Sequence, residues 1–250
     1  MSLQTKTNKH PVAVTLTGPL HLQKGMKCQD CFAYKQNGNR FVAVVSDGAG
    51  TAKFGKIGAK TACETLCDIL SAKNLEPSRK SVVFALETAR EKLLQHRFNR
   101  TKSSEDLINF AATVVGVVYE NNKGMFFHIG DGAGIAFFDE SMQKFVISKP
   151  ENGKFLCETY FYTMDDWNDS LRFTDFSNAT QICLMTDGVT NFALKNCAKN
   201  IESKFIIPVL SFLNNEKSHK KSMRALINTL STSQAKKISS DDKTFLWARF

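Results

Sequence analysis

The chain has 250 residues, a formal net charge of +9, 42% hydrophobic residues and 23% charged residues. This composition is ordinary for a folded protein and excludes a disordered chain. No apolar run approaches the ~20 residues that span a membrane, and the polar start MSLQTKTNKHP lacks the apolar core of a secretory signal. The seven cysteines have no framework spacing, which favours free thiols. We therefore expect a cytoplasmic protein that makes no membrane contact.

The excess of positive charge is scattered along the chain rather than gathered in one stripe. No nucleic-acid-binding motif accompanies it, and we expect no nucleic-acid partner. The densest group, Lys217 to Arg224, lies in a predicted helix and is interpreted as a solvated face. Cys28 and Cys31 form a CxxC pair, but a zinc site would need a second pair and a redox motif a surrounding βαβ unit.

Hydrophobic periodicity divides the chain into short strands and longer amphipathic helices. In chain order, we predict strands over 12–17, 31–34 and 41–45, helices over 57–72 and 78–98, strands over 111–119, 125–129, 133–138, 144–148 and 181–186, helices over 201–212 and 218–230, and a strand over 245–250. The strands come in antiparallel runs and the helices in pairs, which favours an α+β protein. We expect the four strands from 111 to 148 to form one meander, and the last strand to close a sheet.

The segment 150–178 is the least regular part of the chain. A long irregular segment inside a compact domain is more often functional than idle, and we interpret it as a flap or insertion over the edge of a sheet. No Pro/Ser-rich linker divides the sequence. We therefore expect residues 1–250 to form a single domain.

Acidic residues occur repeatedly at the ends of apolar runs. FVAVVSDGAG, MFFHIGDG and QICLMTDG each place an Asp-Gly after a predicted strand, and SSDDKTFLWARF places two Asp residues before the last strand. These residues are Asp47, Asp131, Asp187, Asp241 and Asp242. One Asp-Gly alone could be only a β-turn. Carboxylates held close together repel unless a cation joins them, and oxygen ligands favour Mg²⁺ or Mn²⁺, so the repeated pattern favours a shared metal site.

The motifs GPLHLQKGMKCQD, VVSDGAG, HIGDGAG, MTDGVTNF and SSDDKT occur in this order. The ordered set resembles the metal-dependent protein phosphatases of type 2C, the PPM family. It is most similar to the short bacterial branch, whose members have a His, then CQD, DGAG and a late DDKT. The resemblance covers about residues 17–250. It implies a four-layer αββα sandwich of two antiparallel sheets flanked by helix pairs.

The resemblance also implies a function and a site. It implies a monomeric protein-serine/threonine phosphatase whose substrate is a phosphorylated protein and whose partner is a cognate kinase. A water activated by two Mn²⁺ or Mg²⁺ ions would attack the phosphorus. The matching metal ligands are Asp30, Asp47, Gly48, Asp187 and Asp241. Of these, Asp47 and Asp187 are expected to be essential for catalysis.

Some positions depart from the family pattern. Gln29 and Ala49 stand where many relatives have Glu and His, so the proton for the leaving oxygen must come from elsewhere, such as metal-bound water or His21. Relatives usually hold the phosphate with an Arg in the first motif, and here Lys24, Lys27 or His21 lie near that position.

Three further residues are candidates for supporting roles or for a third metal ion. Asp131 matches one acid of the third-metal pair, whereas Asn191 replaces the other. Asp242 is either a ligand or a residue that supports the ligands. His128 lies inside a predicted strand and is interpreted as a core histidine.

Two other functions are compatible with these departures. Gln29, Ala49 and Asn191 would also suit a pseudophosphatase that binds phosphoproteins without hydrolysing them. The third possibility is a phosphatase of a small phosphomonoester.

Overall fold

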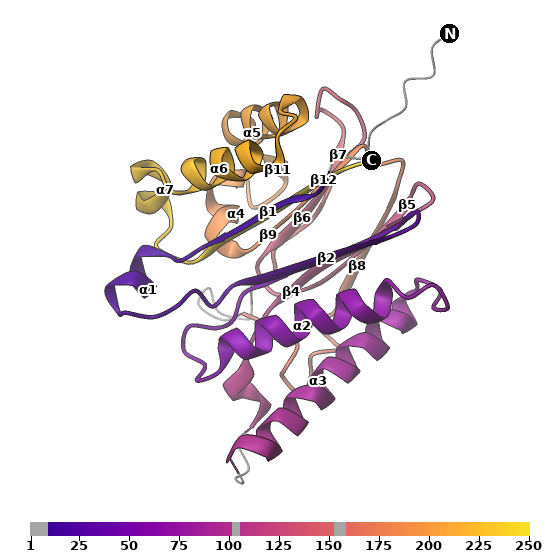
Figure 1. The fold of residues 1–250 in the computed structure, drawn as a ribbon, viewed down its shortest axis with the longest axis vertical. Helices are drawn as coiled ribbons and strands as arrows, with labels where there is room; N and C mark the ends of the chain where they lie inside the picture. The colour runs from indigo at the N-terminus through magenta and orange to yellow at the C-terminus, as the bar shows by residue number, and fades with distance from the viewer. Residues whose placement is uncertain (1–9, 102–105, 153–158) are drawn as a thin grey trace.

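Two five-stranded antiparallel sheets stack face to face in the computed structural model, which describes residues 10–101, 106–152 and 159–250 (Figure 1). Sheet A consists, in spatial order, of β1 (Val12–Leu16), β12 (Lys243–Arg249), β9 (Gln181–Met185), β6 (Ala133–Phe137) and β7 (Phe145–Ser148). Sheet B consists of β2 (Cys31–Asn37), β3 (Arg40–Ser46), β4 (Val114–Glu120), β5 (Lys123–Ile129) and β8 (Arg172–Ser177).

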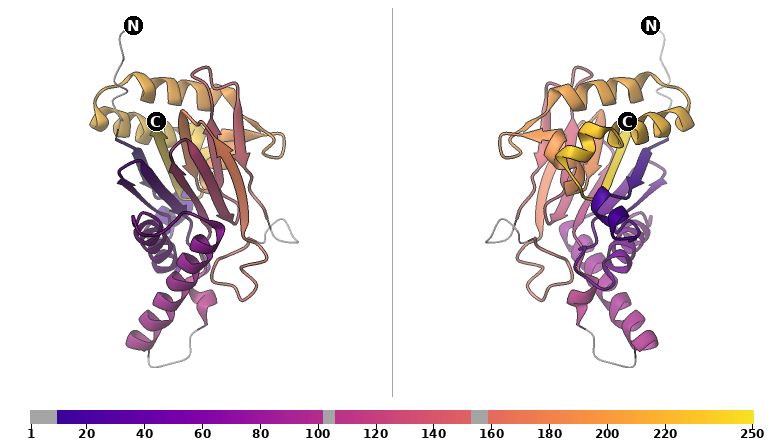
Figure 2. Two further views of the ribbon diagram at one scale, coloured as in Figure 1. Left: turned by 90° about the vertical axis from the view of Figure 1, so that its right-hand side faces the viewer. Right: turned by 90° about the vertical axis from the view of Figure 1, so that its left-hand side faces the viewer.

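A helix pair covers the outer face of each sheet (Figures 1 and 2). α2 (Gly55–Leu70) and α3 (Arg79–Thr101) pack on sheet B, and α5 (Ser203–Asn215) and α6 (His219–Leu230) pack on sheet A. The expected αββα sandwich is therefore confirmed. The shorter elements are α1 (Pro19–Gln23), the 3₁₀ helix η1 (Leu107–Phe110), α4 (Asp187–Ala193), β10 (Leu194–Lys195), β11 (Asn200–Ile201) and α7 (Ser233–Ile238). Across the described ranges, no helix is long and apolar enough to cross a membrane.

β3 shows why the central strands are apolar at every position. Phe41, Ala43 and Val45 face the core between the sheets, whereas Val42 and Val44 face the helices. Successive side chains of a strand point to opposite faces, so a strand with cover on both faces reads as a continuous apolar run.

The predicted meander from 111 to 148 is wrong, because its strands belong to two sheets. β4 and β5 pair in sheet B, and β6 and β7 pair in sheet A. The chain changes sheet after Gly130, whose φ of +110° is a conformation that side-chain-bearing residues rarely adopt. The last strand does not close a sheet either: β12 lies between β1 and β9, because β1 occupies the outer position.

The segment 150–178 is only partly irregular. Its last residues form β8, which pairs with β5 at the edge of sheet B, so this part belongs to the sheet rather than to a flap. Residues 153–158 lie outside the described ranges. Beyond them, the Tyr162 hydroxyl donates to Gly58 O at 2.9 Å, and Arg90 donates to Tyr162 O at 2.8 Å. These bonds anchor the segment to α2 and α3.

Arg40 joins the start of β3 to the end of α2, and its removal should destabilise the fold. This buried guanidinium donates to Ala72 O at 2.6 Å and Leu75 O at 2.7 Å, and pairs with Glu120. Arg40→Met would leave Leu75 O without this donor and the Glu120 carboxylate without its ion pair, so we expect the free energy of unfolding to fall by about 2–4 kcal/mol, measured by urea denaturation.

Lys35→Met is the matched control. Lys35 pairs with Asp68 on the surface, where both side chains are about half exposed, and exposed ion pairs contribute little. We expect a change below about 0.5 kcal/mol. Equal losses in the two variants would contradict the role of Arg40.

Candidate active site

The β2–β3 hairpin brings Asp30 and Asp47 together. Cys31 pairs with Ser46, so Asp30 enters one strand where Asp47 leaves the other. The two carboxyl groups are close enough for each to shift the pKa of the other. Burial raises the pKa of Asp30 to about 6. The pKa of Asp47 is also raised, first by burial and then by the negative charges of Asp30, Asp187 and Asp241.

Sheet A presents its acids at the same end of the sandwich. Met185 of β9 pairs with Ala133 on one side and with Phe245 on the other. Asp187 therefore follows β9 beside the segments that precede β6 and β12, which carry Asp131 and Asp241. Burial raises the pKa of Asp187, and the charges of Asp131, Asp241 and Asp30 raise it further. Acids from both sheets thus form one cluster.

Threonine side chains fix the acidic segments in place. Thr186 Oγ1 donates to Asp30 Oδ2 at 2.7 Å, which links the sheets, and accepts from Thr244 N at 3.0 Å. Thr113 Oγ1 accepts from Asp47 N at 3.1 Å, and Thr113 N donates to Asp47 O at 2.8 Å. Thr186 is not among the residues predicted from the sequence, although its place between a buried strand and Asp-Gly was a usable signal.

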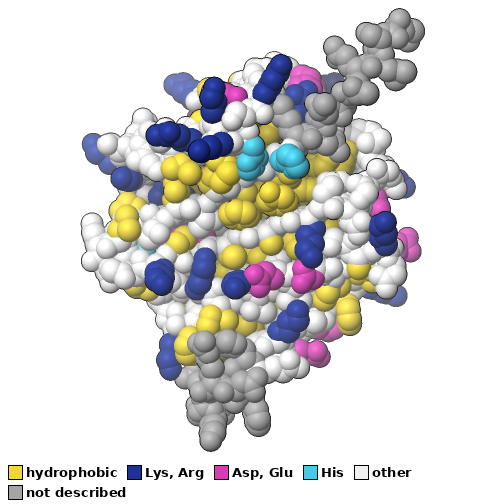
Figure 3. Space-filling model, viewed as in Figure 1, with side chains coloured by type: hydrophobic (Ala, Val, Ile, Leu, Met, Phe, Trp, Pro, Cys, Tyr) yellow, Lys and Arg dark blue, Asp and Glu magenta, His cyan; other side chains and the backbone are white. Residues whose placement is uncertain are grey.

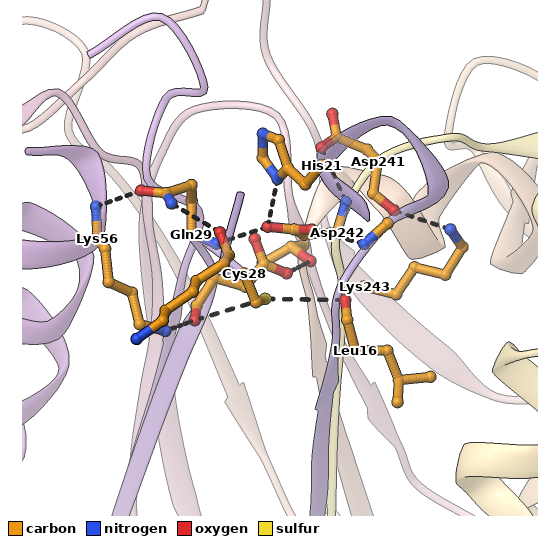
Figure 4. A network of polar contacts seen from close by, with 12 residues as sticks. Leu16, His21, Cys28, Gln29, Lys56, Asp241, Asp242 and Lys243 are labelled. Carbon is orange, nitrogen blue, oxygen red and sulfur yellow. Dashed lines mark hydrogen bonds and ion pairs between the residues drawn. The ribbon is translucent and has the colours of Figure 1, made fainter. Parts of the chain in front are cut away.

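Asp242 organises the first motif and has little capacity left for a metal (Figure 4). Its Oδ1 accepts from Gly18 N at 2.6 Å, and its Oδ2 accepts from Gln29 N at 2.6 Å. Oδ2 also lies 2.9 Å from His21 Nδ1. The side chains of Asp242 and His21 are both buried, so this pair orients the imidazole from the core side.

Gln29, like Asp242, forms hydrogen bonds that hold neighbouring segments of the chain together. Its Oε1 accepts from Lys56 N at 2.9 Å, and its Nε2 donates to Lys27 O at 2.7 Å (Figure 4). Lys56 Nζ donates to Asp30 O. The Gln29 side chain is neutral and already bonded to the backbone, so it does not replace the Glu that many relatives have at this position.

Lys243 places a buried cation beside the cluster. Its Nζ donates to Ser239 O and Asp241 O, both at 2.8 Å, and the residue is 2% exposed. Burial lowers the pKa of this ammonium group, while the nearby carboxylates raise it. Lys243 therefore holds the segment that carries Asp241 and partly offsets the negative charge.

The cluster fits divalent cations that prefer oxygen ligands. Within the described part of the chain, three buried carboxylate oxygens have no hydrogen-bond partner: Oδ1 of Asp30, of Asp131 and of Asp187. Buried charged oxygens without donors are costly, and a cation removes that cost. No group of three or more His, Cys, Asp and Glu side chains among the described residues is already placed to hold one ion. Mg²⁺ sites commonly use one or two carboxylates plus water, so this arrangement remains compatible with such ions.

A pocket of about 780 Å³ opens beside Asp131 and Asp187. Thr159 lines one side and donates to Asp131 Oδ2 at 2.6 Å, which ties the segment after 158 to the cluster. The other side is formed by α4 and the β10–β11 turn. In that turn Asn196, Cys197 and Ala198 all have positive φ, between 53° and 56°, a strained conformation of the kind often found at functional sites.

Other candidates lie at the margin of the site or outside it. Asn191 is exposed and lines the pocket. Lys24 is exposed at the end of α1, and no described side chain pairs with it. His128 is a buried core residue whose Nδ1 lies 3.1 Å from Ser148 Oγ, and burial lowers its pKa well below the ordinary value.

A family model described as "Protein phosphatase 2C" matches residues 17–238. The chain belongs to the protein phosphatase 2C family. This confirms the resemblance found in the motifs, although no curated protein sequence matches the chain.

Solved structures share the fold of this protein phosphatase 2C chain. A bacterial serine phosphatase matches with a TM-score of 0.66 at 16% identity, over 96% of this chain and 97% of its own. The serine/threonine phosphatase Stp1 from Staphylococcus aureus matches with a TM-score of 0.63 at 15% identity, over 100% and 98%. PppA, described as a key regulatory component of T6SS in Pseudomonas aeruginosa, matches with a TM-score of 0.62 at 15% identity, over 96% of each chain.

Without metal, this protein phosphatase 2C chain should lose stability as the pH rises through the ionisation of Asp30. The pKa of Asp30 is raised from 3.8 to about 6 by folding, so the folded state keeps a proton that the unfolded state has released. The free energy of unfolding should therefore fall between about pH 4 and pH 7, by on the order of 2–3 kcal/mol from this residue. Urea denaturation in EDTA measures the fall.

Asp30→Asn cannot ionise, and its amide oxygen can still accept from Thr186. We expect a weaker decline with pH in this variant than in the wild type. Asp175→Asn, at an exposed surface ion pair with Arg79, should keep the wild-type decline. Identical pH profiles for the wild type and Asp30→Asn would disprove the assignment.

Proposed function

We propose that this chain hydrolyses phosphoserine and phosphothreonine in proteins, using divalent ions held by the acidic cluster. One observation carries the proposal: carboxylates from distant segments lie close together, and three of their oxygens are buried with no donor among the described residues. The residues that would hold the ions are Asp30, Asp47, Asp187, Asp241 and the carbonyl of Gly48. Two Mn²⁺ or Mg²⁺ ions, when bound, would supply Lewis acidity and an activated water.

The chain's own residues orient the acidic side chains, bind the substrate and deliver a proton. Thr186 and Thr113 fix the orientation of Asp30 and the Asp47 segment, so little reorganisation is needed when a ligand binds. Asp131 faces the pocket with Asp187, and we assign that pocket to the substrate beside the phosphoryl group. The segments that form the site come from both sheets, and we therefore propose that residues 1–250 act as one domain.

We assign proton donation to His21. Asp242 contacts Nδ1, and a Cβ built at Gly50 would lie 3.1 Å from Nε2. Nε2 thus points toward the loop that carries Asp47, and it has no hydrogen-bond partner among the described residues. The imidazole could fill the role left open by Ala49, because it reaches the same loop from α1. Asp242 is a positioning residue in this scheme, not a metal ligand.

Asp47→Asn and Asp187→Asn should each lower manganese-dependent hydrolysis of p-nitrophenyl phosphate by at least ~10²-fold. Each change removes one negative charge from the ion site and leaves the side-chain volume almost unchanged, so metal binding measured by calorimetry should weaken in parallel. Asp175→Asn lies on exposed β8 and should retain wild-type activity. Unchanged turnover in both site variants would reject the metal-site assignment, whereas metal binding without hydrolysis of any phosphopeptide would favour a pseudophosphatase.

His21→Gln should affect substrates according to their leaving group. Threonine leaves as a strongly basic alkoxide that needs a proton, whereas p-nitrophenolate leaves without one. We expect kcat for a phosphothreonine peptide to fall by about 10²-fold and kcat for p-nitrophenyl phosphate to change by less than about threefold. His219→Gln, at an exposed histidine of α6, is the control. Equal losses on both substrates would show a structural role instead.

A further inference from the structure

One corner of the molecule carries positive charge without any acidic residue. It is formed by α1, α6 and α7, and residues 18–29 and 217–240 contain no Asp or Glu. We call its exposed cations the basic surface: Lys24, Lys27, Lys217, Lys220, Lys221, Arg224, Lys236 and Lys237. Figure 3 shows dark blue side chains gathered over α6 and α7, while the acidic side chains of that face lie over other elements.

The cations of the basic surface have no internal partners. Some exposed cations elsewhere pair with acids, as in Lys35–Asp68, Lys60–Glu64 and Arg79–Asp175, whereas others, such as Lys73 and Lys123, form no ion pair with a described residue. None of the basic surface forms an ion pair with a described residue. Like charges gathered without counter-charges repel one another. Binding of an acidic partner would reduce that repulsion. A face that meets only solvent would be more stable with acidic residues among its cations, so their absence favours a partner.

The basic surface adjoins the candidate active site. α7 ends at Ile238, three residues before Asp241. Leu20 N of α1 donates to Ser240 O at 3.1 Å, so α1 lies against the same segment. Figure 1 and the right panel of Figure 2 both show α1 next to α7. A chain that reaches the acidic cluster from this side passes over these cations.

Exposed apolar side chains lie among the charges. Leu20 is 42% exposed, Leu22 61% and Ile238 45%. Leu20 and Leu22 belong to α1, which touches the segment after Ile238. The corner therefore offers apolar contact together with positive charge, and the complementary ligand carries both apolar and acidic side chains.

We propose that the basic surface docks an acidic segment of the phosphoprotein substrate, in which Glu or Asp residues alternate with apolar residues next to the phosphoserine or phosphothreonine. This proposal rests on the proposed function and names its substrate class. The surface steers the negative segment toward the site and adds affinity that falls as salt rises.

Two other anionic partners fit the surface less well. Residues 18–29 and 217–240 contain no Phe, Tyr or Trp, so the stacking that binds single-stranded nucleic acids is missing. A lipid surface would be met by a broad apolar helix face, whereas α1 has only five residues and the apolar face of α6 packs on sheet A.

The test uses two fluorescein-labelled phosphothreonine peptides that share their five central residues. One has flanks of Glu and Leu, and the other has flanks of Gln and Ser. We expect the acidic peptide to bind wild-type protein in EDTA at least tenfold more tightly by fluorescence anisotropy, and its kcat/KM with Mn²⁺ to be at least tenfold higher. Both advantages should shrink severalfold in 0.5 M NaCl, because the Debye length falls to about 4 Å.

The informative variant is Lys221→Glu/Arg224→Glu/Lys236→Glu/Lys237→Glu. We expect it to lose the preference for the acidic peptide while its turnover of p-nitrophenyl phosphate stays within about twofold of the wild type. The corresponding Gln variant should lie between the two, which separates charge from misfolding. In the matched control, Glu replaces four exposed lysines at the far end of the sandwich: Lys73, Lys80, Lys123 and Lys144. This control should keep the preference for the acidic peptide.

The outcomes separate this proposal from the function on which it rests. Failure of the wild type to hydrolyse p-nitrophenyl phosphate and both peptides would overturn the proposed function, while anisotropy would still test the docking surface. Equal affinity for the two peptides, or full preference in the charge-reversed variant, would overturn the docking surface. Stronger binding to phosphatidylserine vesicles than to the acidic peptide, lost in the same variant, would overturn it in favour of a membrane partner.

Discussion

Asp30 is buried, Asp47 and Asp187 are partly buried, and the electrostatic cost of bringing these carboxyl groups close together must be offset by their surroundings. Burial raises the pKa of each carboxyl, and the neighbouring negative charges raise the pKa values of Asp47 and Asp187 further. Hydrogen bonds from threonines and the ammonium of Lys243 offset only part of that cost, because three oxygens keep no donor among the described residues. The unfavourable electrostatic energy is therefore concentrated at one end of the sandwich, where a divalent cation would contribute most to stability.

Asp242 shows how the first motif depends on this end of the fold. Its carboxylate joins Gly18, His21 and Gln29, although these residues are more than two hundred positions away in sequence. Helix α1, which holds His21, and the segment that holds Asp241 are thus one structural unit. A change in either one alters the other, so the orientation of the His21 imidazole and the position of Asp241 depend on each other.

The sequence sufficed to select Asp47, Asp131, Asp187 and Asp241 because each lies at the end of a predicted apolar strand, whereas Asp30 was selected only through the resemblance to the family. It also sufficed for the helix pairs and the layer order implied by the resemblance. Sheet membership was not readable, since the transfer between sheets at Gly130 leaves the hydrophobic pattern of β5 and β6 unchanged. Thr186 escaped notice because its hydrogen bond to Asp30 depends on how the two sheets stack.

The central place of β12 has a consequence for how the protein is made. β1 leaves the ribosome more than two hundred residues before β12, which is its one neighbour among the described strands of sheet A. At about 5–20 residues per second, residues 12–16 wait on the order of 10–50 s for residues 243–249. Asp241 is synthesised just before β12. A nascent chain therefore carries an unpaired strand and an incomplete acidic cluster until β12 has been synthesised, and chaperones that shield exposed strand edges would act during that interval.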